Sequence, residues 1–243
     1  MVRDDELDCL CGPGAVLAAF AARPDSILRL FHLPTRRGLV GPLCAAMARM
    51  RRPYREVSAE ELARIARTQH HGGVVAVALP RSVTPLPAPF PPALLSAPVL
   101  PLLDGVGNPH NLGAIARSAA FLGCAGLLLS DDPRGAGLSD AAYRTAEGGL
   151  EHLAVHRLAN LPVAIRALAP RFLTVAAVPR GGVAPAALPR GKPFLLVMGH
   201  EETGLAPATE AACAARVTLP GSGRVESLNV SVAAAVLIHA LAG

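Results

Sequence analysis

The sequence predicts an α/β protein: a parallel sheet with helices on both faces, preceded by a small α+β domain. Two observations predict this. From residue 99 onward, short continuous apolar runs alternate with helical segments, which is typical of parallel strands buried on both faces. Before that point, a proline-rich stretch at 80–98 separates off a front segment of different composition, rich in arginine.

Composition limits the class of protein. The chain has 243 residues, 51% of them hydrophobic, so it can bury a core without disulfides or metals. No apolar run reaches the length of a membrane-spanning helix, and the start, MVRDDELD, does not resemble a signal peptide. We therefore expect a soluble, cytoplasmic protein. The five cysteines are irregularly spaced, so reduced thiols are expected rather than disulfides or a metal site.

Residues 1–79 are interpreted as the small α+β domain. Within them, residues 23–67 hold ten arginines against four acidic residues, an excess of six, while the whole chain carries +5. Clustered arginine suits contact with phosphates. The alternative is an arginine-rich solvated face. Helices are expected near 14–21, 41–51 and 59–67, with a strand at 74–79.

The domain boundary is placed in the proline-rich stretch. Seven of the 19 residues in 80–98 are proline. Proline fixes φ and removes a backbone donor, so residues 80–97 are expected to form an extended linker.

Residues 98–243 are expected to form the parallel sheet, which would bind ligands beyond the carboxyl ends of its strands. The predicted strands are 99–103, 126–129, 153–156, 172–178, 194–198 and 216–219, and the predicted helices are 109–122, 139–149, 161–169, 205–214 and 229–241.

The first polar stretch, DGVGNPHNLGAIARSAAFLG (104–123), follows the first of these strands. Asn108 and Pro109 fit the cap and first position of a helix. His110 stands where a dinucleotide-binding fingerprint needs its third glycine, which excludes that motif and disfavours an oxidoreductase. Arg117 is the only charged residue between 111 and 122 and needs a partner. A purely structural ion pair is the alternative.

The second stretch is FLLVMGHEETGLAP (194–207). A strand followed by Gly-x-x-x-x-Gly resembles a phosphate loop. However, Leu205 and Ala206 replace the lysine and hydroxyl residue that a nucleoside triphosphatase needs. Glu201 and Glu202 follow the strand, and one carboxylate is expected to pair with Arg117. Alternatively, glutamate is there only because the dipole of the next helix favours it.

The third stretch, VTLPGSGRVESLN (217–229), precedes an apolar helix. Serine and asparagine cap helices by accepting bonds from free backbone N–H groups, which is one interpretation of Ser227 and Asn229. The other is that these groups face a ligand, because a helix N-terminus favours electron-rich groups.

In this order, the three stretches resemble the motifs of the SpoU (TrmH-type) RNA 2′-O-ribose methyltransferases of the SPOUT superfamily. The front segment is similar to that family's substrate-binding domain, which has a ribosomal-protein-like fold, and His70–His71–Gly72 stands where such domains often carry His-Gln-Gly. The matching residues are Asn111–Leu112–Gly113–Ala114–Ile115–x–Arg117, Gly199–x–Glu201–x–x–Gly204–Leu205, and Leu219–Pro220 with Glu226–Ser227–Leu228–Asn229.

The resemblance implies a C-terminal trefoil knot, a homodimer with active sites at its interface, no metal, and S-adenosylmethionine held by backbone groups. Arg117 would be the base or a cation that stabilises the developing alkoxide. Glu201 would orient Arg117, and Ser227 and Asn229 would position the ribose or the helix start. The implied cofactor residues are Val197, Met198, Gly199, Leu219, Pro220, Leu228 and Asn229, and the implied catalytic residues are Asn111, Arg117, Glu201, Ser227 and Asn229.

The implied substrate is a large structured RNA, because relatives with such a front domain mostly modify large-subunit ribosomal RNA, often at guanosine. Transfer RNA stays open, as does a non-catalytic RNA-binding protein of the same fold. The sequence departs from the family pattern at Asn108, Glu202 and Gly221, where relatives often have Asp, Gly and Met. RNA contacts are expected from Arg23, Arg29, Arg36, Arg37, Arg51, Arg52 and His70.

Overall fold

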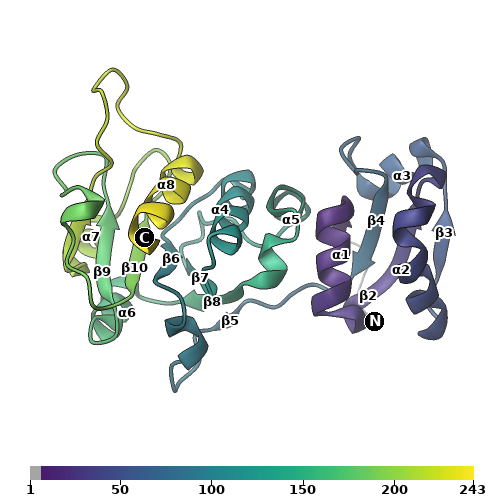
Figure 1. Cartoon of the computed structure of the whole chain (residues 1–243), viewed down its shortest axis with the longest axis horizontal. Helices are drawn as coiled ribbons and strands as arrows, with labels where there is room; N and C mark the ends of the chain where they lie inside the picture. The colour runs from purple at the N-terminus through teal and green to yellow at the C-terminus, as the bar shows by residue number, and fades with distance from the viewer. Residues whose placement is uncertain (1–6) are drawn as a thin grey trace.

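The computed structural model describes residues 7–243 and contains two sheets, one in each half of the chain (Figure 1). The front sheet has the order β1-β4-β2-β3, with β4 antiparallel to β1 and β2, and β3 parallel to β2. Its elements are β1 (Asp8–Cys11), α1 (Pro13–Ala22), η2 (Pro24–Ser26), β2 (Ile27–His32), η3 (Pro34–Arg36), α2 (Arg37–Arg49), β3 (Tyr54–Glu56), α3 (Ala59–Ala66) and β4 (Val74–Ala78).

The front sheet is covered on both faces. Leu10 and Ala76 pack with residues of α1 and α2, whereas Cys9, Cys11 and Val75 pack with α3. The three predicted helices and the strand at 74–79 are confirmed. The sequence did not predict β1, β2 and β3.

The second sheet has the order β11-β9-β10-β6-β7-β8-β5, and all its pairings are parallel. All six predicted strands and five predicted helices are confirmed, with small shifts at their ends. The elements are β5 (Thr84–Pro85), η4 (Pro92–Leu95), β6 (Val99–Leu103), α4 (Pro109–Phe121), β7 (Gly126–Ser130), α5 (Asp140–Ala146), η5 (Gly149–His152), β8 (Ala154–Leu158), α6 (Leu161–Leu168), β9 (Leu173–Ala177), η6 (Pro185–Ala187), β10 (Phe194–Met198), α7 (Pro207–Ala212), β11 (Ala215–Val217) and α8 (Val230–Ala242).

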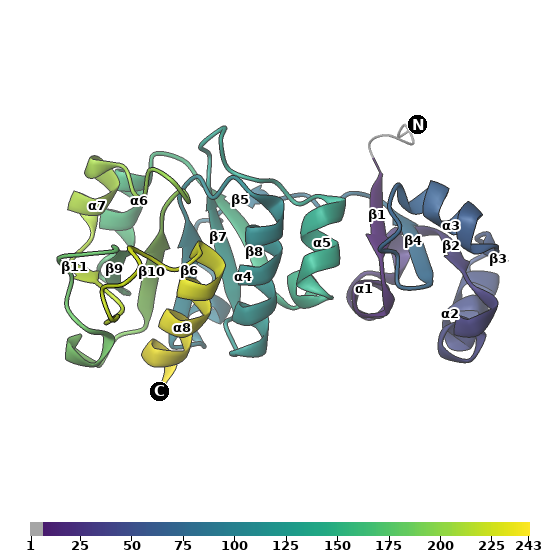
Figure 2. The same ribbon diagram turned by 90° about the horizontal axis from the view of Figure 1, so that it is seen from above.

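Strand alternation sorts the side chains of the second sheet into two cores. On β6, Val99 and Leu103 face the core that contains α4 and α8, whereas Leu100 and Leu102 face the core that contains α6. This is the period-two pattern of a strand buried on both faces. Figure 2 shows α6 and α7 on one side of the strands, and α4 and α8 on the other.

The proline-rich stretch is not a free linker along its whole length. Thr84–Pro85 pairs with β8 and becomes the edge strand of the second sheet. Phe90 packs edge-on against Phe172 at 5.7 Å between ring centroids, and Leu94 is buried. The expected linker at 80–97 is therefore wrong in extent, because its apolar residues between the prolines join the larger core.

No helix among residues 7–243 is both long and apolar enough to cross a bilayer.

Candidate active site

The loops that follow β6 and β10 start side by side. These strands are neighbours, with Leu103 opposite Met198, and the Asp104 N–H donates to the Met198 carbonyl at 2.7 Å. Helix α4 begins directly after the first loop, and α8 packs against α4. The carboxyl edge of the sheet thus gathers all three polar stretches that the sequence singled out.

One hydrogen-bond network joins the three stretches. The Asn111 amide Nδ2 donates to Glu201 Oε1 at 2.9 Å, and Asn229 Nδ2 donates to Asn111 Oδ1 at 3.1 Å. Glu201 also accepts from the backbone N–H groups of Gly107 and Asn108, at 3.0 and 3.1 Å. Asn111 therefore uses both ends of its amide to hold Glu201 and Asn229, which are 90 and 118 residues away in the chain.

The bonds that Glu201 accepts also set its charge state. Burial raises the pKa of the Glu201 carboxyl, but the bonds from Asn111 and from the backbone N–H groups outweigh burial, so the net pKa lies below its ordinary value. Glu201 is thus an ionised acceptor whose oxygens are engaged by donors. That arrangement suits a group that orients its neighbours.

Two helices point their capped N-termini at this network. Asn108 caps α4 by accepting from the His110 N–H at 2.9 Å, as predicted. Asn229 caps α8 by accepting from the Ser231 N–H at 2.9 Å while donating to Asn111. The capping interpretation of Asn229 is confirmed, and its ligand-facing role stays a prediction. Ser227 is exposed.

Arg117 does not pair with Glu201, so that expectation is wrong. Its Nη1 lies 3.6 Å from Glu147 Oε1, and both side chains are largely exposed, at 60% and 57%. The reason is geometric: Arg117 lies six residues beyond Asn111, about 9 Å further along α4 and on another side of it. Sequence reasoning missed Glu147. The sequence indicates only a turn there, because Glu147 precedes Gly148–Gly149; in the structure Glu147 ends α5 with a positive φ of 47°.

The expected cofactor residues fall into two groups. The side chains of Val197 and Met198 are buried on opposite faces of β10, so only their backbone groups could contact a ligand, and their role stays a prediction. Gly199 lies against the next turn: a Cβ there would be 2.3 Å from the Gly204 carbonyl carbon, and His200 and Gly204 exchange two backbone bonds. Leu219 is partly exposed, and Pro220 and Leu228 are exposed, so their side chains are accessible to a ligand with apolar parts.

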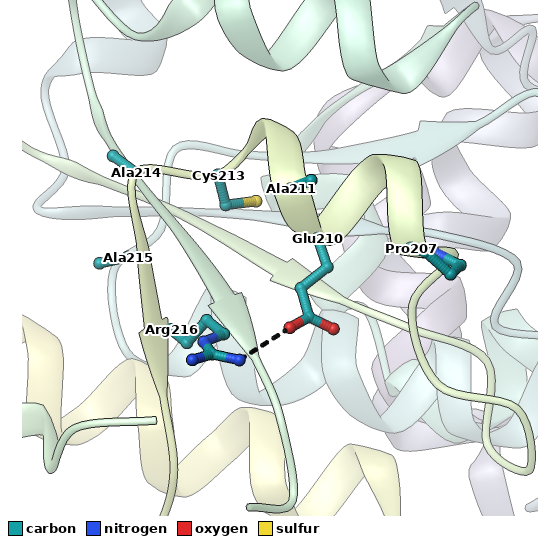
Figure 3. A pocket seen from close by; sticks show the side chains of 7 residues that line it. All are labelled: Pro207, Glu210, Ala211, Cys213, Ala214, Ala215 and Arg216. Atoms are coloured by element: carbon teal, nitrogen blue, oxygen red, sulfur yellow. Dashed lines mark hydrogen bonds and ion pairs between the residues drawn. The ribbon is translucent and has the colours of Figure 1, made fainter. Parts of the chain in front are cut away.

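Two hollows lie outside this network. One of about 420 Å³ adjoins Asp104 and Ser130 at the ends of β6 and β7. The other, of about 610 Å³, lies between α7 and β11, where Arg216 and Glu210 pair at 3.4 Å (Figure 3). Neither is lined by an expected catalytic residue. Among residues 7–243, no three His, Cys, Asp or Glu side chains are grouped closely enough to hold a metal ion.

The residues expected to contact RNA are divided among different places. Arg23 is a correction: its side chain is only 17% exposed and is bonded to Glu151 in the second domain. Arg36 and Arg37 lie at the start of α2, and Arg51 and Arg52 lie just beyond its end, about 20 Å apart along a 13-residue helix.

Their local contacts also differ. Arg36 Nε donates to the Gly72 carbonyl at 3.0 Å, which brings the start of α2 beside the exposed His70. Arg52 Nη1 donates to the Ile27 carbonyl at 2.6 Å and so braces the start of β2. Arg29 is half-buried on β2. The number of arginines in the sequence does not show which of them are bonded within the protein and which are available to RNA.

Comparisons with known proteins agree with this architecture. The family model described as "SpoU rRNA Methylase family" matches residues 98–239, and the one described as "RNA 2'-O ribose methyltransferase substrate binding" matches residues 9–83. The 23S rRNA (guanosine-2'-O-)-methyltransferase RlmB of Bordetella pertussis is 33% identical over 232 residues, which cover 95% of this chain and 94% of that protein.

Other relatives are longer. The uncharacterized tRNA/rRNA methyltransferase YfiF of Escherichia coli O157:H7 is 33% identical, and the match covers 93% of this chain but 65% of YfiF. The chain spans less than two thirds of that protein and of several similar relatives.

Among solved structures, the AdoMet-bound rRNA methyltransferase of Sinorhizobium meliloti superposes with a TM-score of 0.80 at 22% identity, over 98% of this chain and 87% of that one. The SpoU methyltransferase AviRb of Streptomyces viridochromogenes gives 0.76 at 21% identity, over 98% and 90%. At these identities the likeness concerns the fold alone.

Proposed function

The chain belongs to the SpoU rRNA methylase family, and on that premise we propose that it methylates a ribose 2′-hydroxyl of RNA. One observation carries the proposal: the Asn229–Asn111–Glu201 network, which ties the three motif stretches together at the carboxyl edge of a parallel sheet. Ligands bind at that edge in folds of this type.

S-adenosylmethionine, when bound, supplies a methyl group already activated by a sulfonium. The protein then has to align the hydroxyl with that carbon and help the proton to leave. We assign alignment to Asn111 and Asn229, whose amides are fixed by the network. Glu201 orients Asn111, because its oxygens already accept from other groups.

Arg117 is assigned an electrostatic role. A guanidinium keeps its proton in proteins, so it serves better as a cation beside a developing alkoxide or a substrate phosphate than as a base. Its exposure leaves it accessible to RNA, and the neighbouring Glu147 can yield to a phosphate.

We propose that the cofactor lies against the backbone of Met198 and Gly199 and the segments at Leu219–Pro220 and Leu228. The same region is proposed to form a trefoil knot. Three contacts support the knot: Val183 bridges Val217, η6 packs against α8, and Arg190 donates to the Leu241 carbonyl at 2.7 Å. Pulling on the two ends of single molecules tests it, because a knotted chain stops extending short of its contour length, whereas an unknotted one reaches it.

The proposed substrate is large-subunit ribosomal RNA at a guanosine, as the name of the RlmB relatives suggests, with transfer RNA as the alternative. We propose that Arg36, Arg37 and His70 contact the RNA. They lie at the loop before β4 and the start of α2, on the same side of the molecule as the start of α8, the upper side of Figure 1. The compartment proposed is the cytoplasm.

We also propose a homodimer through the α4–α8 face. Helix α8 exposes Val232 and Val236, 48% and 43% exposed, and the end of α4 exposes Phe121 at 88%. Large apolar side chains exposed on two helices that pack against each other favour a partner surface. Sedimentation of the wild type and of Val236→Glu tests this, with a dimer expected only for the wild type.

The central test supplies S-adenosylmethionine with a labelled methyl group, and offers unmodified ribosomal RNA and transfer RNA separately. Digestion to nucleosides should yield a labelled 2′-O-methyl nucleoside from one pool. Arg117→Ala should abolish transfer and keep cofactor binding. The control Arg166→Ala, which changes an exposed arginine of α6 across the sheet, should keep both. Label on a base, or undiminished transfer by Arg117→Ala, would contradict the proposal.

A further inference from the structure

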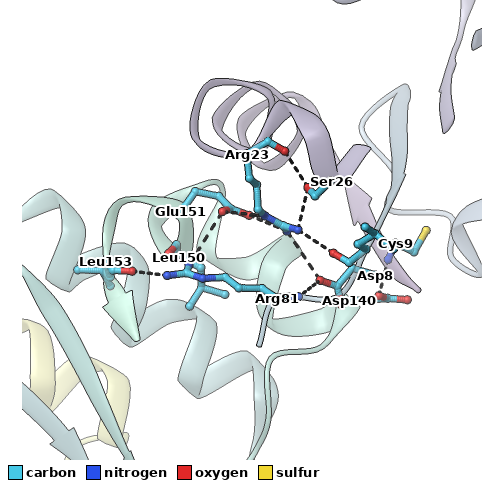
Figure 4. A network of polar contacts seen from close by, with 10 residues as sticks. Asp8, Cys9, Arg23, Ser26, Arg81, Asp140, Leu150, Glu151 and Leu153 are labelled. Atoms are coloured by element: carbon cyan, nitrogen blue, oxygen red, sulfur yellow. Dashed lines mark hydrogen bonds and ion pairs between the residues drawn. The ribbon is translucent and has the colours of Figure 1, made fainter. Parts of the chain in front are cut away.

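A largely buried ionic cluster joins the two domains (Figure 4). Arg23, which follows α1 in the front domain, donates from Nε to both carboxylate oxygens of Glu151, at 3.0 and 3.1 Å, and from Nη2 to Oε1 at 2.9 Å. Glu151 lies in η5 of the second domain, and its side chain is 3% exposed. Such a pairing of guanidinium and carboxylate fixes orientation as well as distance.

The connecting segment is fastened to the same place. Arg81 lies 4.0 Å from Glu151 through Nη1, and its two terminal nitrogens donate to the carbonyls of Leu150 and Leu153. Its backbone N–H donates to Asp8 at 3.2 Å. Three parts of the chain thus meet at one point: the front strand β1, the segment after β4, and η5.

A second set of bonds lies beside this cluster. The Cys9 N–H donates to Asp140 Oδ1 at 2.8 Å, which ties β1 to the start of α5. Arg23 also reaches back within its own domain, where Nη1 donates to the Leu79 carbonyl at 2.9 Å. Each nitrogen of the Arg23 guanidinium therefore donates to a protein acceptor. The group is less available to an RNA phosphate than that of an exposed arginine.

The backbones of the two domains also touch at glycines. A Cβ on Gly14 of α1 would lie 2.8 Å from the Glu147 carbonyl oxygen, and one on Gly148 would lie 2.8 Å from both the Gly14 carbonyl oxygen and the Ala18 Cβ. Only hydrogen fits at these positions, so α1 rests directly on the chain between α5 and η5. A proline-rich boundary would ordinarily allow relative domain motion. Here close packing and a buried ion pair oppose it.

We propose that the Arg23–Glu151–Arg81 cluster is a positioning device, which holds the front domain at a set distance and angle from the catalytic edge. This rests on the proposed function. RNA bound at Arg36 and Arg37 would then reach the catalytic edge without a search over domain orientations. Arg23 acts through the domain interface and not by touching RNA.

The test compares Arg23→Ala, Arg23→Lys and the control Arg55→Ala in the full chain. Arg55 also belongs to the front domain, but its side chain is 61% exposed and pairs with Glu61 of the same domain at 3.1 Å, so its loss removes no contact between domains. Small-angle X-ray scattering without RNA measures the largest dimension of each protein. Methyl transfer to the RNA pool that the wild type modifies gives KM and kcat.

For Arg23→Ala we expect a larger maximum dimension and a KM for RNA raised about tenfold, with kcat within about twofold, because the effective concentration of the catalytic edge falls. Arg23→Lys should recover part of the KM, and Arg55→Ala should match the wild type in shape. An unchanged dimension, or an unchanged KM despite expansion, would overturn the proposal.

If Arg23→Ala does not fold, Glu151→Gln replaces it, since it keeps the shape of the side chain and removes the charge; the same readouts apply. If the wild type methylates no RNA, the proposed function fails on its own, while scattering still decides whether Arg23 holds the domains together.

Discussion

Two polar networks of similar size differ in what they can do. The Asn229–Asn111–Glu201 network lies at the carboxyl edge, joins loops of one domain, and sits beside exposed Ser227 and Leu228. The Arg23–Glu151–Arg81 cluster is ionic and largely buried, with side chains 17%, 3% and 21% exposed, and it joins two domains. The first has neighbours that a ligand can reach. The second has its donors and acceptors engaged with protein. Residue type alone does not distinguish a ligand-binding site from a structural contact between domains; accessibility to a ligand does.

The largest effect on stability is expected at the Arg23–Glu151–Arg81 cluster. Glu151→Ala removes the carboxylate that Arg23 and Arg81 share, but Arg23 keeps Asp8 at 3.7 Å. The loss is therefore expected at about 3 kcal/mol, the lower end of the cost of removing one member of a buried pair. Urea unfolding measures it. Glu201→Ala, at the open network, should cost clearly less. Equal losses of unfolding free energy in the two variants would contradict the expected difference in stability between the two networks.

Within the open network, the largest effect on activity is expected at Asn111. Asn111→Ala removes both links between the motif stretches, and loss of alignment of this kind reduces turnover by about a hundredfold. Initial rates at saturating cofactor and RNA measure it. The matched variant Asn160→Ala, which changes an asparagine before α6 on the other face of the sheet, should keep its rate. An unchanged rate for Asn111→Ala would show that the network is not needed for catalysis.

A smaller effect concerns pH. The pKa of Glu201 is lowered in the folded protein, so its stabilising contribution is present above the pKa of the unfolded chain, ordinarily about 4.3. It is lost as pH falls through the lower folded pKa. The difference in Tm between wild type and Glu201→Gln should therefore be largest near neutrality and shrink below about pH 4. A difference that grows in acid would show that the sign is wrong.

The smallest effect on stability is expected at the ion pair of Arg117 with Glu147. This pair is exposed on both sides, and exposed pairs contribute about 0–1 kcal/mol. Glu147→Gln should thus change the free energy of unfolding by less than about 1 kcal/mol, as measured by urea titration at low and high salt. A larger, salt-sensitive loss would indicate that Glu147 fastens the domains as Glu151 does.

Apart from β5, the strands and helices of the second domain could be predicted from the sequence, because most of its strands are continuous apolar runs separated by helical segments. The front domain was harder. β3 is three exposed residues, and β2 carries Arg29 within its run, so neither resembles a buried strand. Residues 84–95 mislead for another reason: the prolines suggest a free linker, while Phe90 and Leu94 bury themselves.

The sequence predicted which residues form the candidate site better than it predicted their contacts. Motif order placed Asn111, Glu201 and Asn229 together, and capping rules located Asn229 at the start of α8. Neither rule gives the side of α4 on which Arg117 projects, nor whether an arginine is exposed. The pairing of Arg117 with Glu147 and the burial of Arg23 depend on how α5 and α1 pack, which is set by contacts distant in sequence.

The edge strand β5 has a consequence for solubility. A sheet edge with free N–H and C=O groups can recruit a strand from another molecule and seed aggregation. Here the edge is two residues long, and one of them is Pro85, which has no N–H to offer. The proline-rich stretch thereby ends the seven-stranded sheet on that side and blocks its extension by a neighbouring chain.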